Sequence, residues 1–185
     1  MAFTSFTEIE SYILSNNIVK TIALACAQDE IALASLVEAK RKGVVKGILI
    51  GDLEEIKAIL SDLSEPVEDY ELIECLDEME AGRLAVSLVK EGRADIPMKG
   101  LMMTSSFMKA ILNKEEGFLG QGDLLSQSTV LEYPEQGRMQ IIADCAVNIA
   151  PDLEEKKKLL KIVSIWPTNW ALTNLMSLSC QPLKK

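Results

Sequence analysis

A lysine, a glycine and two hydroxyl side chains lie close together in one stretch of this chain. Residues 94–100 read Ala-Asp-Ile-Pro-Met-Lys-Gly, and Thr104 and Ser105 follow at the start of an amphipathic helix pattern. A helix N-terminus offers unpaired N–H groups and the positive end of the helix dipole, which suits an anion. We therefore expect Lys99, Gly100, Thr104 and Ser105 to form a phosphate-sized site. The same spacing also fits an ordinary loop in which a hydroxyl caps the helix.

A second stretch places an acid and an amide around a loop that follows a strand pattern. Residues 143–153 read Ala-Asp-Cys-Ala-Val-Asn-Ile-Ala-Pro-Asp-Leu. Asp144 and Asn148 could orient a substrate there, or could only stabilise the turn through their side chains. Cys145 has no neighbouring base, so we interpret it as a packing residue. The chain has no Walker or dinucleotide-binding glycine pattern, which argues against a P-loop ATPase or a typical dehydrogenase.

Together these two stretches resemble the phosphate acetyl/butyryltransferase family, and more closely its butyryltransferase branch. The resemblance extends from about Val19 to Lys161 and includes residues 23–30 and 48–52. It implies a three-layer α/β/α fold with a mostly parallel sheet, like the isocitrate and isopropylmalate dehydrogenases, of which this chain would hold the first domain. It also implies conversion of acyl-CoA and phosphate into acyl phosphate and CoA, with no separate cofactor because the CoA thioester is itself a substrate.

The resemblance also bears on individual residues and on partners. Lys109 aligns with a family position that carries a cation facing the cleft, although a solvated helix lysine is an equal alternative. The family takes its decisive catalytic residues from the later part of the chain, so the catalytic residues here are unknown. Members of the family would use acyl-CoA and phosphate as partners. We expect the full-length form to be a homo-oligomer.

Composition narrows the class of protein. The 185 residues carry a net charge of −9, which argues against a nucleic-acid partner. The chain contains no histidine, and its four cysteines lack metal-binding spacing, so we expect neither a metal site nor disulfides. We also find no membrane-spanning run and no signal-peptide pattern at the N-terminus, and therefore expect a cytoplasmic protein.

Strand and helix patterns alternate along the chain, which favours a βαβ sheet. Asp29 is an expected helix cap and Gly43 an expected helix stop. Pro97 cannot donate to a strand neighbour, so its strand should lie at a sheet edge. Helices are expected over 6–16, from residue 30 to Gly43, over 53–60 and over 77–92; strands over 19–27, 46–50, 70–73, around 97, 125–132 and 138–143.

The amino-acid composition of the chain changes after Lys161. All 28 acidic residues precede position 162, and both tryptophans follow it. We therefore expect an N-terminal α/β domain over 1–161 and an atypical tail over 162–185. Tryptophan has a single codon, so part of a shifted reading frame is forced. If the third base of each codon is read with the first two bases of the next, the pairs Trp166-Pro167, Asn169-Trp170 and Trp170-Ala171 must give Ala, Leu and Gly. These residues restore the family's Ala-x-x-Leu-Gly pattern. We hypothesise that the tail is a frameshift product; the alternative is a genuine short variant.

Two functions from different classes remain open on the sequence. The first is an enzyme fragment, the N-terminal domain of a phosphate acyltransferase that is inactive alone and acts on butyryl or branched-chain substrates. The second is a non-catalytic module that binds an anion or acyl-CoA. A related two-domain fold, such as a decarboxylating dehydrogenase or a fatty-acid phosphate acyltransferase, fits the two stretches less well.

Overall fold

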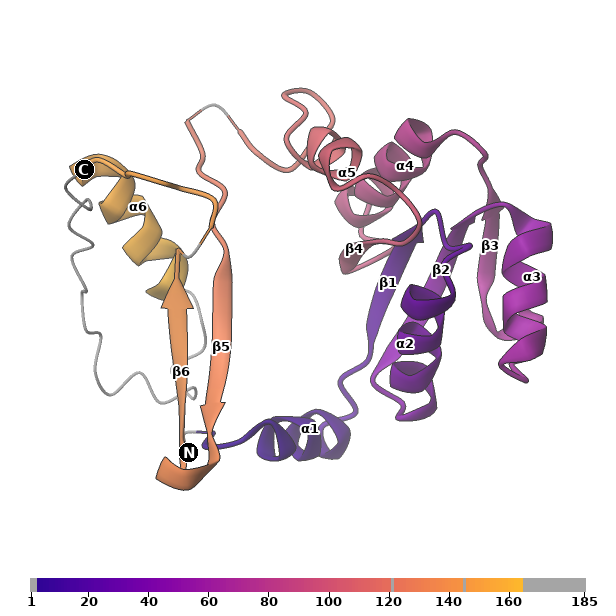
Figure 1. Cartoon of the computed structure of the whole chain (residues 1–185), viewed down its shortest axis with the longest axis horizontal. Coiled ribbons are helices and arrows are strands. Elements are labelled where there is room, and N and C mark those ends of the chain that lie inside the picture. Colours follow the sequence, from indigo (N-terminus) through magenta and orange to yellow (C-terminus); the bar gives the residue numbers. More distant parts are fainter. Residues whose placement is uncertain (1–2, 121, 145, 165–185) are drawn as a thin grey trace. The chain divides into compact units, whose positions relative to one another are not determined.

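The computed structural model describes residues 3–120, 122–144 and 146–164 (Figure 1). The chain divides into two compact units, which we describe separately. Residues 13–121 form the sheet unit, and residues 1–12 with 122–185 form the ribbon unit. Helix α1 (Phe6–Ser15) contains the point where the chain passes between them. Among the described residues, no helix is both long and apolar enough to cross a membrane.

The sheet unit is built on four parallel strands in the order β3-β2-β1-β4. These are β1 (Lys20–Ala25), β2 (Val45–Gly51), β3 (Glu71–Glu74) and β4 (Ile96–Lys99). The connecting helices are α2 (Glu30–Arg41), α3 (Leu53–Asp62) and α4 (Glu78–Lys90), with α5 (Thr104–Ile111) after β4. A short 3-10 turn, η1 (Val67–Asp69), precedes β3. This mostly parallel α/β sheet confirms the expected fold class.

Alternation along the central strands divides the core into two layers. Ala23 and Ala25 of β1 pack with residues of α4 and α5, whereas Leu24 between them packs with residues of α2 and α3. These helices flank the sheet in Figure 1. The same alternation holds in β2, where Ile48 and Ile50 lie on one side and Leu49 on the other. Successive side chains of a strand point to opposite faces, so a strand covered on both faces must be apolar throughout. The continuous apolar pattern of β1 has this origin.

Local sequence signals mark where helix α2 begins and ends. The side chain of Asp29 accepts hydrogen bonds from the backbone N–H groups of Ile31 and Ala32, which confirms it as the cap of α2. Gly43 follows the helix with a φ of +78°, and its N–H donates to the carbonyl of Lys40. Glycine adopts this left-handed conformation without a steric penalty, so it ends the helix as expected.

Pro97 lies in β4, which pairs with β1 and forms one edge of the four-stranded sheet. The predicted edge position is therefore confirmed. The ribbon unit holds β5 (Ser128–Tyr133) and β6 (Arg138–Ala143), which pair antiparallel around the turn η2 (Pro134–Gln136), and helix α6 (Leu153–Ser164). The two expected strands joined by a turn are confirmed, although β5 begins at Ser128 rather than at residue 125, and together they form a separate two-stranded sheet.

The domain boundaries expected at 161 and 162 stay a prediction, and the two compact units divide the chain more finely than that prediction did. Helix α6 continues to Ser164, slightly past the point where the sequence changes character. The remainder of the tail, on which the frameshift hypothesis depends, lies outside the described residues, as does Cys145.

Candidate functional site

The order of the strands marks one edge of the sheet as the place for a ligand. From β1 the chain moves outward to β2 and β3, and it then returns to the opposite side of β1 to form β4. In open α/β sheets, ligands bind outside the carboxyl ends of the strands where the order reverses in this way. Lys99 and Gly100 lie at the carboxyl end of β4, beside the end of β1. Lys99 and Gly100 thus lie at the switch point of the sheet.

Gly100 is needed where the β4–α5 loop crosses the end of β1. Its N–H donates to the carbonyl of Ala25 at 2.8 Å, and the N–H of Leu101 donates to the carbonyl of Cys26 at 2.9 Å. A Cβ atom on residue 100 would lie 2.3 Å from the carbonyl oxygen of Cys26, well inside van der Waals contact. The two backbones can approach this closely only because Gly100 has no side chain. This contact sets the direction in which the loop leaves the sheet.

Lys99 is half-buried, and its ammonium group turns back onto the loop. Its Nζ donates to the carbonyls of Gly100 at 3.3 Å and Met102 at 3.2 Å. Both are long for hydrogen bonds from a charged donor, which are commonly about 2.7–2.9 Å. These two carbonyls use two of the three donors of the ammonium group, so Lys99 has a third donor with which to bind an anion at this loop.

Helix α5 begins differently from the capped helix that the sequence left open as an alternative. Its N-cap residue is Met103, whose side chain makes no capping hydrogen bond, and Thr104 is already the first helical residue. The hydroxyl-cap alternative is therefore wrong. The side chains of Thr104 and Ser105 are exposed at the first turn, where they remain candidates for an anion site.

Glu78 is the residue here that the sequence analysis missed. Its Oε1 accepts a hydrogen bond from the backbone N–H of Met103 at 3.2 Å. Because Glu78 is also the first residue of α4, one carboxylate serves the N-terminal ends of two helices. The sequence analysis placed a helix start at residue 77, and Asp77 is the cap of α4: its Oδ1 accepts a hydrogen bond from the N–H of Glu80. Contact between Glu78 and α5 depends on the return of the chain to β4, which no local pattern reveals.

Two cysteines lie near the same edge, and neither has the properties of a nucleophile. Burial raises the pKa of the Cys26 thiol, and the nearby carboxylate of Glu78 raises it further. Burial likewise raises the pKa of Cys75. Thiols held above their ordinary pKa stay protonated at neutral pH and react slowly. Both cysteines are free thiols.

Lys109 lies in the last turn of α5 and is exposed. It belongs to the same helix as Thr104 and Ser105, two turns away at most, and its exposure matches the solvated alternative from the sequence. A basic residue in the last turn also complements the negative end of the helix dipole. The structure therefore places Lys99, Gly100, Thr104, Ser105 and Lys109 in one loop and the helix that follows it.

Asp144 and Asn148 belong to the ribbon unit and hold one loop together. Asp144 Oδ1 accepts from the N–H groups of Ala146 and Val147, each at 2.9 Å, and its Oδ2 accepts from Asn148 Nδ2. Asn148 Nδ2 also donates to the carbonyl of Leu125 at 2.9 Å. Partial burial acts to raise the pKa of Asp144, but these hydrogen bonds outweigh it and lower the pKa overall. The turn-stabilising role that the sequence left open for this pair is thus present.

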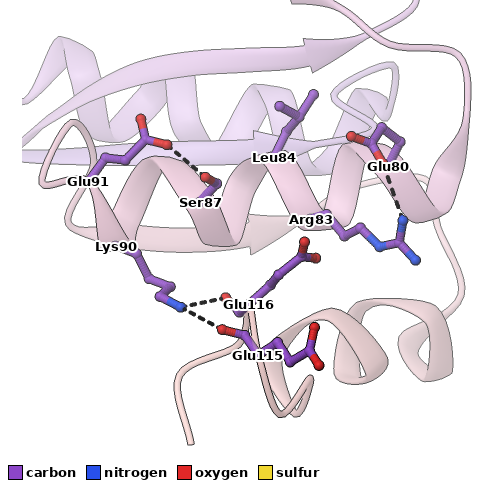
Figure 2. Close-up of a pocket in the computed structure, with 8 residues that line it drawn as sticks. All are labelled: Glu80, Arg83, Leu84, Ser87, Lys90, Glu91, Glu115 and Glu116. Carbon is purple, nitrogen blue, oxygen red and sulfur yellow. Dashed lines mark hydrogen bonds and ion pairs between the residues drawn. The ribbon is translucent and has the colours of Figure 1, made fainter.

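An open groove of about 560 Å³ lies elsewhere on the sheet unit, along the outer side of α4 (Figure 2). None of the sequence-predicted site residues lines it. Lys90 donates to the carbonyls of Glu115 and Glu116, so it fastens the loop after α5 onto α4. Arg83 pairs with Glu80 on the same helix. The cations of this groove are thus engaged within the protein, and the groove offers an anion little. Among the residues that the structure describes, no cluster of metal-ligating side chains occurs.

Comparisons with known proteins agree with the resemblance carried by the two sequence stretches. Residues 77–163 match the family model described as phosphate acetyl/butaryl transferase. The chain is 38% identical over 152 residues to a phosphate butyryltransferase from Clostridium acetobutylicum, covering 82% of this chain and 50% of that protein. It is 35% identical over 142 residues to a phosphate acetyltransferase from Thermotoga maritima, covering 77% of this chain and 48% of that protein.

A solved structure supports the fold. The crystal structure of a branched-chain phosphotransacylase from Enterococcus faecalis V583 superposes with a TM-score of 0.61 at 22% identity, covering 77% of this chain and 49% of that one. The chain spans about half the length of the curated relatives it matches. The shared segments include both stretches on which the site was predicted, and the relatives are named as transferases. This chain belongs to the phosphate acetyl/butyryltransferase family.

Proposed function

We propose that this chain forms part of a phosphate acyltransferase that converts acyl-CoA and inorganic phosphate into acyl phosphate and free CoA. A butyryl or branched-chain acyl group is the proposed substrate. The observation that carries the proposal is the β4–α5 loop, which presents Lys99 beside the N-terminus of α5 at the switch point of the sheet. The names of the relatives, among them a phosphate butyryltransferase, support the reaction class.

The reaction requires few chemical groups from the protein. An oxygen of phosphate attacks the carbonyl carbon of the thioester, and the new C–O bond leaves a tetrahedral oxyanion. That oxyanion collapses, the C–S bond breaks, and CoA leaves as a thiolate that takes up a proton. Phosphate is itself the nucleophile, so the chain can lack histidine, as it does. The proposal therefore includes no cofactor, and the CoA thioester enters as a substrate.

The main contribution of the protein to catalysis is to hold phosphate next to the thioester. We assign phosphate binding to Lys99, the backbone around Gly100 and the hydroxyls of Thr104 and Ser105. The Nζ of Lys99 would exchange its two long contacts with loop carbonyls for phosphate oxygens, a stronger, charge-assisted interaction. Lys109 would attract the substrate anions from the exposed side of α5. In the ribbon unit, Asp144 and Asn148 are proposed to shape a substrate-facing loop.

A second candidate is a non-catalytic module that binds an anion or acyl-CoA. One observation favours it: residues 13–121 have a four-stranded sheet with a core on each face, and they carry the whole Lys99 loop. We propose that the 185-residue chain by itself has no turnover, because it spans half the length of its relatives. The proposal includes a homo-oligomeric, cytoplasmic enzyme in the full-length form.

Sequencing the gene across codons 158–190 and restoring the shifted frame after Lys161 tests the proposal. Acyl-phosphate formation from butyryl-CoA should stay at background for the 185-residue chain and rise clearly above it for the restored protein. In the restored protein, Lys99→Ala should raise the KM for phosphate at least about tenfold, because it removes one charge-assisted contact. Lys114→Ala, an exposed lysine just after α5, is the matched control and should leave KM unchanged.

Three results would argue against parts of the proposal. Turnover by the 185-residue chain would contradict its proposed inactivity. An unchanged KM in Lys99→Ala would remove Lys99 from the phosphate site. A restored protein that binds butyryl-CoA and phosphate but produces no acyl phosphate would favour the non-catalytic module.

A further inference from the structure

Helix α4 holds the β4–α5 loop from one side. The buried side chain of Met102 lies over Gly82, and its terminal methyl group is 3.2 Å from the position that a Cβ on residue 82 would take. The next backbone N–H, that of Met103, donates to Glu78 Oε1 at 3.2 Å. Glu78 and Gly82 are four residues apart in α4, so they lie on the same face of that helix. This face of α4 therefore contacts two successive loop residues, one by packing and one by a hydrogen bond.

The peptide group between Met102 and Met103 connects Glu78 to Lys99. Its carbonyl oxygen accepts a hydrogen bond from Lys99 Nζ at 3.2 Å, and its N–H donates to Glu78. The C=O and N–H of a trans peptide point in opposite directions in one plane, so a group that fixes the N–H also fixes the carbonyl. Hydrogen bonds at the two ends of such a group also polarise each other. Glu78 thus acts on the ammonium group of Lys99 through the backbone.

The position of Met103 also sets where α5 begins. Met103 is the N-cap of α5, and Thr104 is its first helical residue. At the other end of the loop, the N–H of Gly100 donates to the end of β1. Because both ends of this short loop are anchored, Lys99 before it and the hydroxyls of Thr104 and Ser105 after it are held in one relative arrangement.

We propose that Glu78 is a positioning residue of the phosphate site: through the N–H of Met103, it fixes Lys99 relative to the hydroxyl groups at the start of α5. The consequence for phosphate rests on the proposed function, whereas the effect on Lys99 does not. A site whose groups are already in place loses less conformational entropy when its ligand binds. The positive N-terminal ends of α4 and α5 offset the negative charge of Glu78, so its carboxylate holds the loop more than it repels phosphate.

Three substitutions separate the hydrogen bond of Glu78 from its charge. Glu78→Gln removes the charge and keeps an acceptor oxygen at the same reach. Glu78→Asp keeps the charge but is one methylene shorter, so it loses contact with Met103; an acidic residue suits the first turn of a helix, so this variant should fold. Glu78→Ala removes both. Glu80→Ala is the matched control, because it removes a carboxylate from the same first turn of α4, where Glu80 pairs with Arg83 at 3.5 Å.

The first measurement follows Lys99 in the 185-residue chain without phosphate. Trace acylation of lysines, quantified by peptide mass spectrometry, compares the labelling rate of Lys99 with that of the exposed Lys114. Loss of the hydrogen bond to Met103 should loosen the contacts that hold Lys99 on the loop. Its labelling should therefore rise at least about threefold in Glu78→Asp and Glu78→Ala, and should stay close to wild type in Glu78→Gln and Glu80→Ala.

The second measurement titrates the same chains with inorganic phosphate and follows binding by phosphorus NMR. Glu78→Asp and Glu78→Ala should weaken phosphate binding at least about threefold, whereas Glu78→Gln and Glu80→Ala should bind like the wild type. Urea unfolding of each variant is measured alongside. Lower stability in Glu78→Asp and Glu78→Ala, with unchanged phosphate binding and unchanged Lys99 labelling, would show a purely structural contact and would overturn the inference.

Two other results would also overturn it. Wild-type labelling of Lys99 in Glu78→Asp, with raised labelling in Glu78→Gln, would show that the charge acts and the hydrogen bond does not. Tighter phosphate binding by Glu78→Gln would show that the carboxylate mainly repels phosphate. Failure of the proposed function has a different signature: if the wild-type chain binds no phosphate while Lys99 labelling follows the expected pattern, the phosphate site is wrong and the positioning of Lys99 by Glu78 stands.

Discussion

Replacing Gly100 with alanine tests whether the close crossing of β1 by the β4–α5 loop positions the candidate site. The added Cβ would lie 2.3 Å from the carbonyl oxygen of Cys26 and 3.2 Å from that of Ala25. Both contacts are with backbone atoms, so no flexible side chain can move aside. The loop must shift away from β1 or the strand must distort, and either change disturbs the orientation of Lys99.

The cost follows from the contacts that such a shift would break. Two backbone hydrogen bonds hold the loop to β1, from the N–H of Gly100 at 2.8 Å and from that of Leu101 at 2.9 Å. Each contributes about 0.5–1.5 kcal/mol, and overpacking a closely packed region adds about 1–3 kcal/mol. The lower backbone entropy of alanine in the unfolded chain returns about 0.4–1 kcal/mol. We expect a net destabilisation of about 1–6 kcal/mol.

Urea unfolding followed by far-UV circular dichroism measures this cost, with Gly82→Ala as the matched control. A Cβ at position 82 would lie 3.2 Å from the terminal methyl group of Met102, which can rotate away, and alanine favours the α4 helix. The control should therefore stay within about 1 kcal/mol of the wild type. A Gly100→Ala protein with wild-type stability would show that the loop does not depend on this close approach, and would refute the positional argument for Lys99.

Four further predictions concern the sheet unit. Leu24→Ala should cost about 2–5 kcal/mol in urea unfolding, because Leu24 is fully buried between β1 and α2; a loss below 1 kcal/mol would contradict the assigned core. Asp29→Ala should cost about 0.5–2 kcal/mol through loss of the α2 cap, and Asp29→Asn should restore most of it. Hydrogen bonding from Lys40 lowers the pKa of Glu65. The contribution of Glu65 to stability is therefore present above the ordinary glutamate pKa and is lost as the pH falls through the lowered value. Glu65→Gln should flatten this acid limb of the stability–pH curve, and an unchanged limb would contradict the pairing. Burial, with a hydrogen bond to Glu65, raises the pKa of Tyr70 to about 12. The contribution of Tyr70 to stability is therefore present below about pH 10 and is lost as the pH rises toward 12. Tyr70→Phe should remove that loss of stability, and persistence of the full alkaline limb would refute the assignment to Tyr70.

Much of the candidate site could be located from the sequence because its residues are neighbours in the chain. Lys99, Gly100, Thr104 and Ser105 fall within one strand–loop–helix segment. The sequence patterns predicted the strand around residue 97 and the helix that starts near Thr104, and the structure has both. The edge position of Pro97 also followed from one local fact, the missing N–H of proline. The hydroxyl cap was a local alternative too, and it is wrong, because the N-cap position is taken by Met103 and Thr104 is already the first helical residue.

The sequence by itself determined the elements of this protein: the apolar strands, the capping aspartate of α2, the glycine that ends it, and the two stretches that identify the family. These depend on interactions over a few residues, which local spacing records directly. Only the tertiary structure decided the strand order that puts Lys99 at the switch point, the contact between Glu78 and α5, and the need for Gly100 beneath Cys26. Each joins segments that are distant in the chain, and the free energy that joins them comes from burying two apolar layers at once, which no single segment encodes.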